Sequence, residues 1–204
     1  MVLASGSPAR LATLRAAGLD PAVLTSGIDE DAVAATLADA TPARVAAVLS
    51  AAKCAAVAGV LRAPAPTLVV GCDSLLELEG EGYGKPADAD AAVALWRRMR
   101  GRTGVLHTGH CVRLLPGGDE RQAVASTTVH FADVSDAEVE AYVLSQEPLA
   151  VAGAFTLDGL GGAYVRGVEG DPHNVVGISL PLLRDLVADL GTPWHTLWAH
   201  RGSG

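Results

Sequence analysis

Side chains that could bind a phosphate lie close to the start of the chain. Ser5, Gly6 and Ser7 form a short polar turn. Pro8 suits the first turn of a helix, and Arg10 follows two residues later. A helix N-terminus offers free backbone N–H groups and the positive end of its dipole, so hydroxyls and a guanidinium there suit an anion. The same residues also fit an ordinary helix cap with an exposed arginine, and the spacing leaves both interpretations open.

A lysine interrupts an apolar helical pattern farther along the chain. Val45, Leu49, Lys53 and Val57 are spaced by four residues, so they share one face of the helix expected over residues 42–61. An ammonium group in such a stripe needs an anion nearby. The alternative is that Lys53 lies at the edge of the stripe and extends its amine to solvent.

Two groups of carboxylates could act with these cations. Asp73 closes "TLVVGCD", a predicted buried strand, and open α/β sheets bind ligands beyond the carboxyl ends of their strands. Asp73 could equally well form a turn. The cluster Asp29, Glu30 and Asp31 could supply a metal ligand, although acidic triplets usually begin solvated helices.

A second lysine lies on a glycine-rich loop. Lys85 is part of "GYGKP", ahead of a helix that we expect to begin near the capping residue Asp88. The loop is not a P-loop, because Glu79 stands where the first glycine is required and Pro86 replaces the serine or threonine that would hold magnesium. A lysine on such a loop can still reach a phosphate.

Signatures of other enzyme classes do not match. His107 and His110 lack a third ligand at zinc spacing, which predicts structural roles for both. The chain has no G-x-S-x-G nucleophile motif. Leu75 stands where a phosphoaspartyl nucleophile at Asp73 would usually be followed by a second aspartate.

The composition predicts a cytoplasmic globular protein. The chain has 204 residues, half of them hydrophobic, which fits one domain with a sizeable core. A formal charge of −8 argues against nucleic acid or an anionic membrane as partner, so any anionic ligand must be bound locally. Three cysteines without a C-x-x-C pair favour reduced thiols, and no apolar run reaches the roughly 20 residues of a membrane span.

The elements expected to position these residues alternate between strands and helices. Ser135 and Glu138 fit a capping box, and "PGGD" around residues 116–119 predicts a hairpin. Residues 149–178 are too irregular to assign. The pattern predicts one α/β domain over residues 1–204 with a mixed sheet, two lobes with a cleft between them, and disorder at the last few residues. We expect strands at 2–4, 19–26 and 67–73, and helices at 8–17, 42–61 and from about 88, 135 and 181.

The order of the short motifs resembles one protein family along essentially the whole chain. The motifs are "ASGSPAR", Glu30 after "GI", Lys53 in a helix, "GCDS", "GKP", "GRTGVLHTG", "EPLAVAGAF" and "GDPHNVVGISLP". In this order they resemble the Maf family of nucleoside triphosphate pyrophosphatases. The resemblance implies a Maf-like, inosine triphosphatase-like α/β fold: a long bent mixed sheet flanked by helices, two lobes around a central cleft, and a homodimer. It also implies hydrolysis between the α and β phosphates, giving a nucleoside monophosphate and pyrophosphate.

The resemblance also implies roles for individual residues. Ser7 and Arg10 would bind the phosphates, and Lys53 and Lys85 would face them as catalytic lysines. Asp73 would accept a proton. These roles agree with the chemistry of the side chains, because three cations would neutralise charge developing on the leaving pyrophosphate.

A divalent metal is part of the implied reaction. Glu30 and Asp73 would hold Mg²⁺ or Mn²⁺. Such a cation offsets the negative charge of phosphate oxygens and positions or acidifies water, while the aspartate accepts the proton.

Three positions depart from the family pattern. Ala9 stands where the phosphate-binding loop usually has its first arginine, so one contact to substrate is missing. Gly104 stands where histidine is common, with His107 three residues on, and neither receives a role. Asp158 stands where pyrimidine-triphosphate members have glutamine and 7-methyl-GTP members often have glutamate. This carboxylate could read a base edge or bind a second metal, since it accepts but does not donate.

Two classes of function remain open from the sequence. The first is hydrolysis of nucleoside triphosphates, with dTTP and UTP slightly favoured over 7-methyl-GTP or a broad set of modified nucleotides. The second is a nucleotide-binding regulator of cell division or septum formation with little turnover. The joint presence of Glu30, Lys53, Asp73 and Lys85 favours turnover, because binding alone does not need a base beside a metal.

Overall fold

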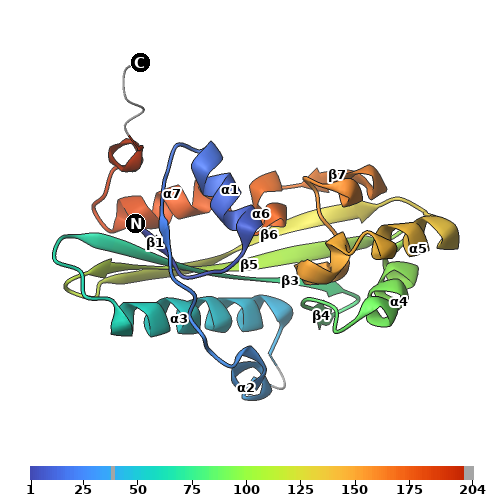
Figure 1. The fold of residues 1–204 in the computed structure, drawn as a ribbon, viewed down its shortest axis with the longest axis horizontal. Coiled ribbons are helices and arrows are strands. Elements are labelled where there is room, and N and C mark those ends of the chain that lie inside the picture. Colours follow the sequence, from blue (N-terminus) through green and yellow to red (C-terminus); the bar gives the residue numbers. More distant parts are fainter. Residues whose placement is uncertain (38–39, 200–204) are drawn as a thin grey trace.

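A mixed seven-stranded sheet forms the centre of the protein in the computed structural model, which describes residues 1–37 and 40–199. The strands are β1 (Val2–Leu3), β2 (Ala22–Val23), β3 (Thr67–Leu78), β4 (Glu81–Tyr83), β5 (Thr103–Leu115), β6 (Glu120–Phe131) and β7 (Val165–Glu169). Their order is β2-β1-β3-β5-β6-β7, and β4 pairs with β3 beside this path. β1 is parallel to β2 and β3, and the other pairs are antiparallel. Figure 1 shows that the sheet is long.

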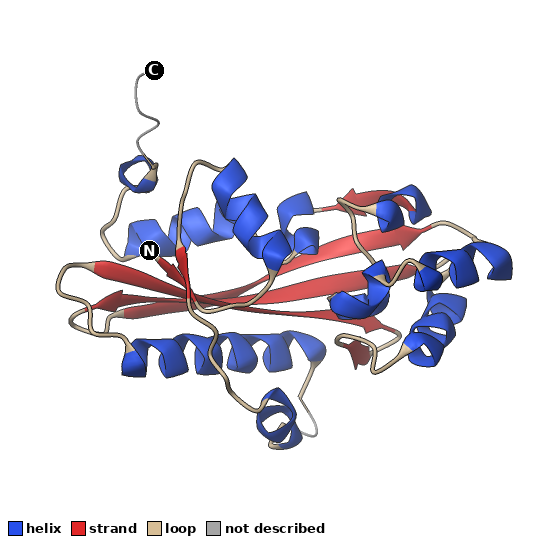
Figure 2. Ribbon diagram, viewed as in Figure 1, coloured by secondary structure: helices blue, strands red, loops and turns tan. Residues whose placement is uncertain are grey.

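Helices cover both faces of this sheet. Figure 2 shows α3 along one face and α1 and α7 along the other, with α4 and α5 at one end. The helices are α1 (Pro8–Ala16), α2 (Glu30–Ala35), α3 (Pro42–Val60), α4 (Ala89–Met99), α5 (Asp136–Leu144), α6 (Pro172–Val176) and α7 (Leu180–Asp189). Short 3-10 turns follow at η1 (Glu147–Ala150), η2 (Ala152–Ala154), η3 (Leu160–Tyr164) and η4 (Trp194–Leu197). This α/β architecture confirms the expected fold class.

Local signals in the sequence predict several helix starts correctly. Asp88 caps α4, its carboxylate accepting from the Ala91 backbone N–H at 2.8 Å. The capping box of α5 is also formed, because Glu138 accepts from the Ser135 backbone N–H at 2.7 Å while the Ser135 hydroxyl accepts in return. At α7 the Ser179 hydroxyl accepts from the Leu182 backbone N–H at 3.3 Å, which is a simple cap. These contacts lie within one turn of chain, which is why the pattern alone predicts them.

One strand prediction is wrong in its boundary. β3 does not end at Asp73 but continues to Leu78, so this carboxylate lies in the middle of the strand. The residues after it keep pairing with β5, Ser74 opposite Thr108 and Glu77 opposite Val105. That pairing extends the strand, and it depends on a segment far away in sequence. The strand expected over residues 19–26 is also wrong in its boundaries, because β2 is only two residues long.

The edge of β3 that faces away from β5 has an opening. β1 pairs with this strand only at Val69 and Val70, and pairing with β4 starts only at Leu76 of β3. The carbonyl of Val70 accepts from Ala4 of the segment after β1, so by alternation the backbone groups of Cys72 and Ser74 point to the same edge. The chain therefore leaves backbone donors and acceptors facing the space between β1 and β4.

Two glycines allow α3 to lie very close to the sheet. A Cβ at Gly71 would overlap the backbone of Ser50, and one at Gly109 would overlap the backbone of Ala46. Neither glycine has a positive φ, so space and not backbone conformation requires it. The close approach fixes the height of Lys53 above β3.

Helix α3 contradicts the expectation that no apolar run reaches the length of a membrane span. α3 has 19 residues and a mean hydropathy of 1.6 over its most apolar window, so by length and composition it is able to cross a membrane. This mean hydropathy is high because the helix is rich in alanine and its only charged residues are Arg44 and Lys53. A helix that covers a sheet also meets this criterion, and 39% of the window is buried in the structure.

The end of the described chain packs back onto the body. The Ala199 backbone N–H donates to the Gly18 carbonyl at 2.7 Å, and the indole of Trp198 lies against the same glycine. Trp194 packs beside a buried cluster around Leu183. The two tryptophans of this segment therefore pack on the body of the protein. The expected disorder of the last residues concerns 200–204, which lie outside the described residues.

Candidate active site

Three of the predicted site residues meet at the opening in β3. The Lys53 Nζ atom lies 2.6 Å from Asp73 Oδ1 and 2.9 Å from Glu30 Oε1. The Lys53 and Asp73 side chains are each 10% exposed, whereas that of Glu30 is 53% exposed. α3, β3 and the first turn of α2 thus each contribute one charged group. Of the two interpretations of the lysine, the one with a nearby anion is correct.

Burial determines the protonation behaviour of Asp73. Its desolvation raises the pKa of this carboxyl above the ordinary value, and the ammonium of Lys53 offsets part of that rise. A carboxylate with a raised pKa is a better proton acceptor near neutral pH than an exposed one. The position of Asp73 therefore suits the role of a base.

The acidic cluster begins a helix and at the same time positions Glu30. Asp29 caps α2, its Oδ1 atom accepting from the Ala32 backbone N–H at 2.9 Å. Glu30 is the first residue of that helix, and its carboxylate reaches Lys53. The helix-start interpretation is confirmed, and it leaves one carboxylate of the cluster directed at the site.

Arg10 is buried and holds three segments together. Its guanidinium donates to the Cys72 carbonyl at 2.9 Å, the Ser74 hydroxyl at 3.0 Å, the Ser5 hydroxyl at 3.0 Å and the Gly177 carbonyl at 2.7 Å. An arginine has five N–H groups, so these bonds leave one N–H for a ligand. Of the two interpretations of this turn, the one with an exposed arginine is wrong in that respect, because Arg10 is only 9% exposed.

The polar turn before α1 is an ordinary cap that also contacts this arginine. The Ser7 hydroxyl accepts from the Arg10 backbone N–H at 3.4 Å. The Ser5 hydroxyl accepts from the Ser7 backbone N–H at 3.2 Å as well as from the guanidinium. The turn follows β1 directly, so the N-terminus of α1 lies at the opening in β3.

Buried hydroxyl and amide groups form a hydrogen-bonded network next to the site. Ser74 is bonded to Thr108 at 2.9 Å, and Thr108 donates to the backbone carbonyl of Asn174 at 3.1 Å. The Asn174 amide donates to Leu106, Ala125 and Thr127. Sequence reasoning gave Ser74, Thr108 and Asn174 no role, although all three lie within the quoted motifs "GCDS", "GRTGVLHTG" and "GDPHNVVGISLP".

His110 has the structural role that its spacing predicts. Its Nδ1 atom donates to the Thr108 carbonyl at 2.9 Å, and its Nε2 atom accepts from the Ser179 backbone N–H at 2.9 Å. The ring thereby fixes the segment that contains Gly177, whose carbonyl binds Arg10. Burial lowers the pKa of His110 to about 4, so the ring is neutral at neutral pH.

We expect this histidine to make the protein acid-sensitive. Between its ordinary pKa of 6.5 and about 4, the unfolded chain binds a proton at His110 that the folded protein does not bind. The free energy of unfolding therefore falls as the pH is lowered through this window, by about 3 kcal/mol in total. Urea unfolding at a series of pH values measures the slope, which should be shallower in His110→Asn. An unchanged slope in His110→Asn would contradict the assignment.

Lys85 and Asp158 lie outside this cluster. Both residues are exposed, and within the described chain neither side chain forms an ion pair with the Lys53 group. Lys85 follows Gly84, which approaches Leu75 at the far side of the opening in β3 and whose carbonyl accepts from Gly153 at 2.9 Å. A ligand that spans the opening is needed to join Lys85 to Lys53.

The loop that contains Asp158 is organised by a carboxylate that sequence reasoning missed. Glu147 accepts from the Tyr142 hydroxyl at 3.0 Å and from the backbone N–H groups of Leu160 and Gly161 at 3.0 and 3.1 Å. The Thr156 hydroxyl donates to the same carboxylate at 2.5 Å. These bonds give the irregular segment a defined shape without regular secondary structure.

The carboxylates at the opening fit a magnesium or manganese ion that is also bound by substrate. No group of three or more His, Cys, Asp or Glu side chains within the described residues could hold a metal. Glu30 and Asp73, however, place two carboxylate oxygens around one cationic group, the Lys53 ammonium. Mg²⁺ usually takes one or two carboxylates together with phosphate oxygens and water, so two protein ligands suffice for it.

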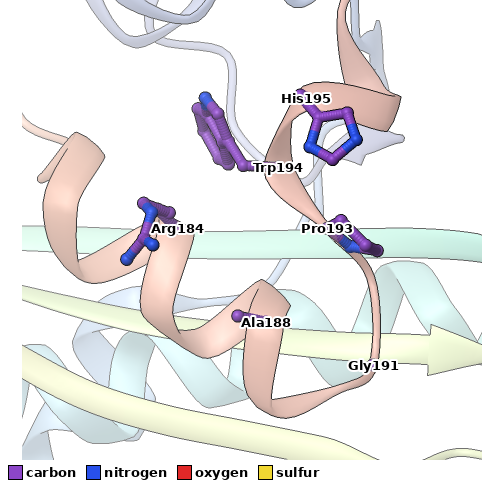
Figure 3. Close-up of a pocket in the computed structure, with 6 residues that line it drawn as sticks. All are labelled: Arg184, Ala188, Gly191, Pro193, Trp194 and His195. Atoms are coloured by element: carbon purple, nitrogen blue, oxygen red, sulfur yellow. The ribbon is translucent and has the colours of Figure 1, made fainter.

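A separate surface hollow of about 560 Å³ lies between α7 and the C-terminal turn. Figure 3 shows Trp194 and His195 on the turn and Arg184 and Ala188 on the helix. Arg184 is paired with Asp185 at 2.7 Å. None of the predicted site residues lines this hollow, so it is not part of the site.

Comparison with known proteins identifies the family of the chain. The family model described as Maf-like protein matches residues 1–190. A "Nucleoside triphosphate pyrophosphatase" of Salinispora tropica is 55% identical over 204 residues, covering 98% of this chain and 87% of that protein. A protein of the same name from Streptomyces coelicolor is 54% identical, covering 98% of this chain and 94% of its own. We conclude that the chain belongs to the Maf family.

Proposed function

We propose that this protein is a nucleoside triphosphate pyrophosphatase that cleaves the bond between the α and β phosphates and releases a nucleoside monophosphate and pyrophosphate. Family membership and the names of the relatives support the activity. The observation that carries the proposal is the meeting of Lys53, Asp73, Glu30 and Arg10 at one opening in the edge of β3. Such a mixture of cations and carboxylates suits a polyphosphate together with a metal.

The cations of the site act on the phosphates. The remaining N–H of Arg10, the N-terminus of α1 and the turn at Ser7 bind the polyphosphate from one side of β3. Lys53 reaches the opening from the other side, and Lys85 reaches it from the loop after β4. Together they neutralise the charge that develops on the leaving pyrophosphate, although the whole protein is acidic.

The carboxylates act on the water and the metal. Glu30 and Asp73 are the residues that would hold Mg²⁺ or Mn²⁺, which supplies charge neutralisation and a more acidic water when bound. Asp73 takes the proton of the attacking water, because its raised pKa makes it a stronger base than an exposed aspartate.

The preference for the base of the substrate is a further part of the proposed activity. We expect dTTP and UTP to be slightly favoured, with 7-methyl-GTP or a broad set of modified nucleotides as the alternative. Asp158 is the candidate residue for this choice, because an exposed carboxylate repels phosphates and is better suited to a base edge. Ala9 stands where the resemblance implies an arginine, so we expect a lower affinity for the phosphates.

A panel of nucleoside triphosphates tests the proposal. Purified protein with Mg²⁺ or Mn²⁺ is incubated with nucleotides that include modified bases, and pyrophosphate and orthophosphate are measured separately. We expect pyrophosphate from at least one nucleotide. If none is released, a nucleotide-binding regulator with little turnover becomes the better explanation.

We also propose that the protein works in the cytoplasm as a homodimer. The three cysteines are free thiols buried in the structure, which agrees with a reducing compartment. Light scattering on purified protein measures the mass of the particle, which should be twice that of one chain.

A further inference from the structure

We infer that Lys53 acts as a placeholder for the divalent cation: in the nucleotide-free protein, its ammonium group occupies the point between the two carboxylates that the cation needs. The inference rests on the proposed metal-dependent reaction and adds an order of events to it. The cation and Lys53 compete for Glu30 and Asp73, so the site binds the cation well only when a nucleotide gives the lysine another anion.

The geometry of the three side chains carries this inference. One nitrogen lies within 3 Å of oxygens from two different carboxylates, at 2.6 Å from Asp73 and 2.9 Å from Glu30. Within the described residues, Lys53 is the ion-pair partner of both carboxylates. Two carboxylates held this close repel each other unless a cation lies between them. Lys53 therefore does in the free protein what a divalent cation would do.

The three groups differ in how easily they move. Asp73 lies in the middle of β3, where pairing with β5 fixes its backbone. Lys53 has a flexible four-carbon stem, so its ammonium can leave without a change in the helix. The side chain is largely buried, and a phosphate bound at the opening would give the ammonium another anion.

Because Lys53 and the divalent cation compete for the same carboxylate oxygens, binding of the cation is coupled to binding of the nucleotide. A triphosphate draws the ammonium away from the carboxylates, and the vacated oxygens then bind the cation more tightly. By linkage, the cation in turn favours the nucleotide. The free protein consequently has a low affinity for the metal alone.

The experiment measures Mn²⁺ binding without nucleotide. Lys53→Met removes the competing ammonium and keeps an apolar stem of similar length, and free Mn²⁺ is counted by its electron paramagnetic resonance signal. We expect the variant to bind Mn²⁺ more tightly than the wild type by about tenfold or more, the factor equivalent to 1.4 kcal/mol. The titration is done at about pH 8.5, because loss of the ammonium further raises the pKa of Asp73.

Matched variants separate competition from the general effect of one lost charge. Arg44→Met removes an exposed positive charge from the same helix and should change Mn²⁺ affinity by less than about twofold, as expected for a screened charge. Adding Glu30→Gln to Lys53→Met should abolish the gain. The inference is wrong if Lys53→Met binds no more tightly than the wild type, or if Arg44→Met gains as much.

The folding of Lys53→Met and the activity of the wild type are measured separately. Circular dichroism shows whether Lys53→Met is folded, and if it is not, the same comparison is made with Lys53→Gln, where an unchanged affinity equally overturns the inference. Failure here leaves the hydrolase intact, since pyrophosphate release by the wild type is measured separately in the nucleotide panel.

Discussion

Replacing Asp73 by asparagine is expected to lower kcat by a factor of about 10² or more while nucleotide binding stays nearly unchanged. The amide has almost the same shape and can still accept the hydrogen bond that Lys53 donates at 2.6 Å. It cannot take a proton from water. Initial rates of pyrophosphate release give kcat and KM, and calorimetry with a non-hydrolysable nucleotide gives the affinity.

A matched control isolates this effect. Asp119→Asn makes the same chemical change in the exposed turn between β5 and β6 and should leave both constants unchanged. Full activity of Asp73→Asn would remove the carboxylate from its role as proton acceptor. A loss confined to KM would instead make it a binding residue.

Replacing Arg10 by lysine is expected to lower the free energy of unfolding by about 3 kcal/mol as well as to abolish activity. The guanidinium bonds two hydroxyls and two backbone carbonyls, on the turn before α1, on β3 and on the segment after α6. A lysine has no planar fork and cannot reach all of them, so buried acceptors lose their donors. Urea unfolding followed by fluorescence measures the loss.

Arg15→Lys serves as the control for this variant. Arg15 lies on the same helix, is exposed and pairs with Asp20 at 3.1 Å, so its replacement should cost less than about 0.5 kcal/mol. Wild-type stability in Arg10→Lys would show that the buried bonds are not needed for folding. Reduced stability with an unchanged KM would separate the structural role of this arginine from substrate binding.

Sequence reasoning succeeded where the determining contacts are local. The cap at Asp88 and the capping box at Ser135 each depend on side chains within three residues, and the hairpin depends on one short turn. The lysine in the apolar stripe of α3 was also informative, because a buried cation requires an anion whatever the fold. The structure supplies two such anions.

The missed features depend on distant segments. The continuation of β3 beyond Asp73 requires its pairing with β5. The burial of Arg10 depends on Gly177, which is 167 residues away in sequence. The irregular segment 149–178 is fixed by hydrogen bonds that it donates to Glu147 and by the bond from its Asn174 amide to the Leu106 carbonyl, and a pattern search has no period with which to detect them.

The claim on which the account depends is that Lys53 and Lys85 serve one bound polyphosphate, although the structure shows no contact between them. The chain contains only these two lysines, so a protein labelled with ¹³C at the lysine ε-carbons gives two assignable resonances. Adding a nucleoside triphosphate with a methylene bridge between its α and β phosphates should shift both resonances along one shared binding curve. A shift of only one lysine, or two curves with different Kd values, would contradict a single pocket.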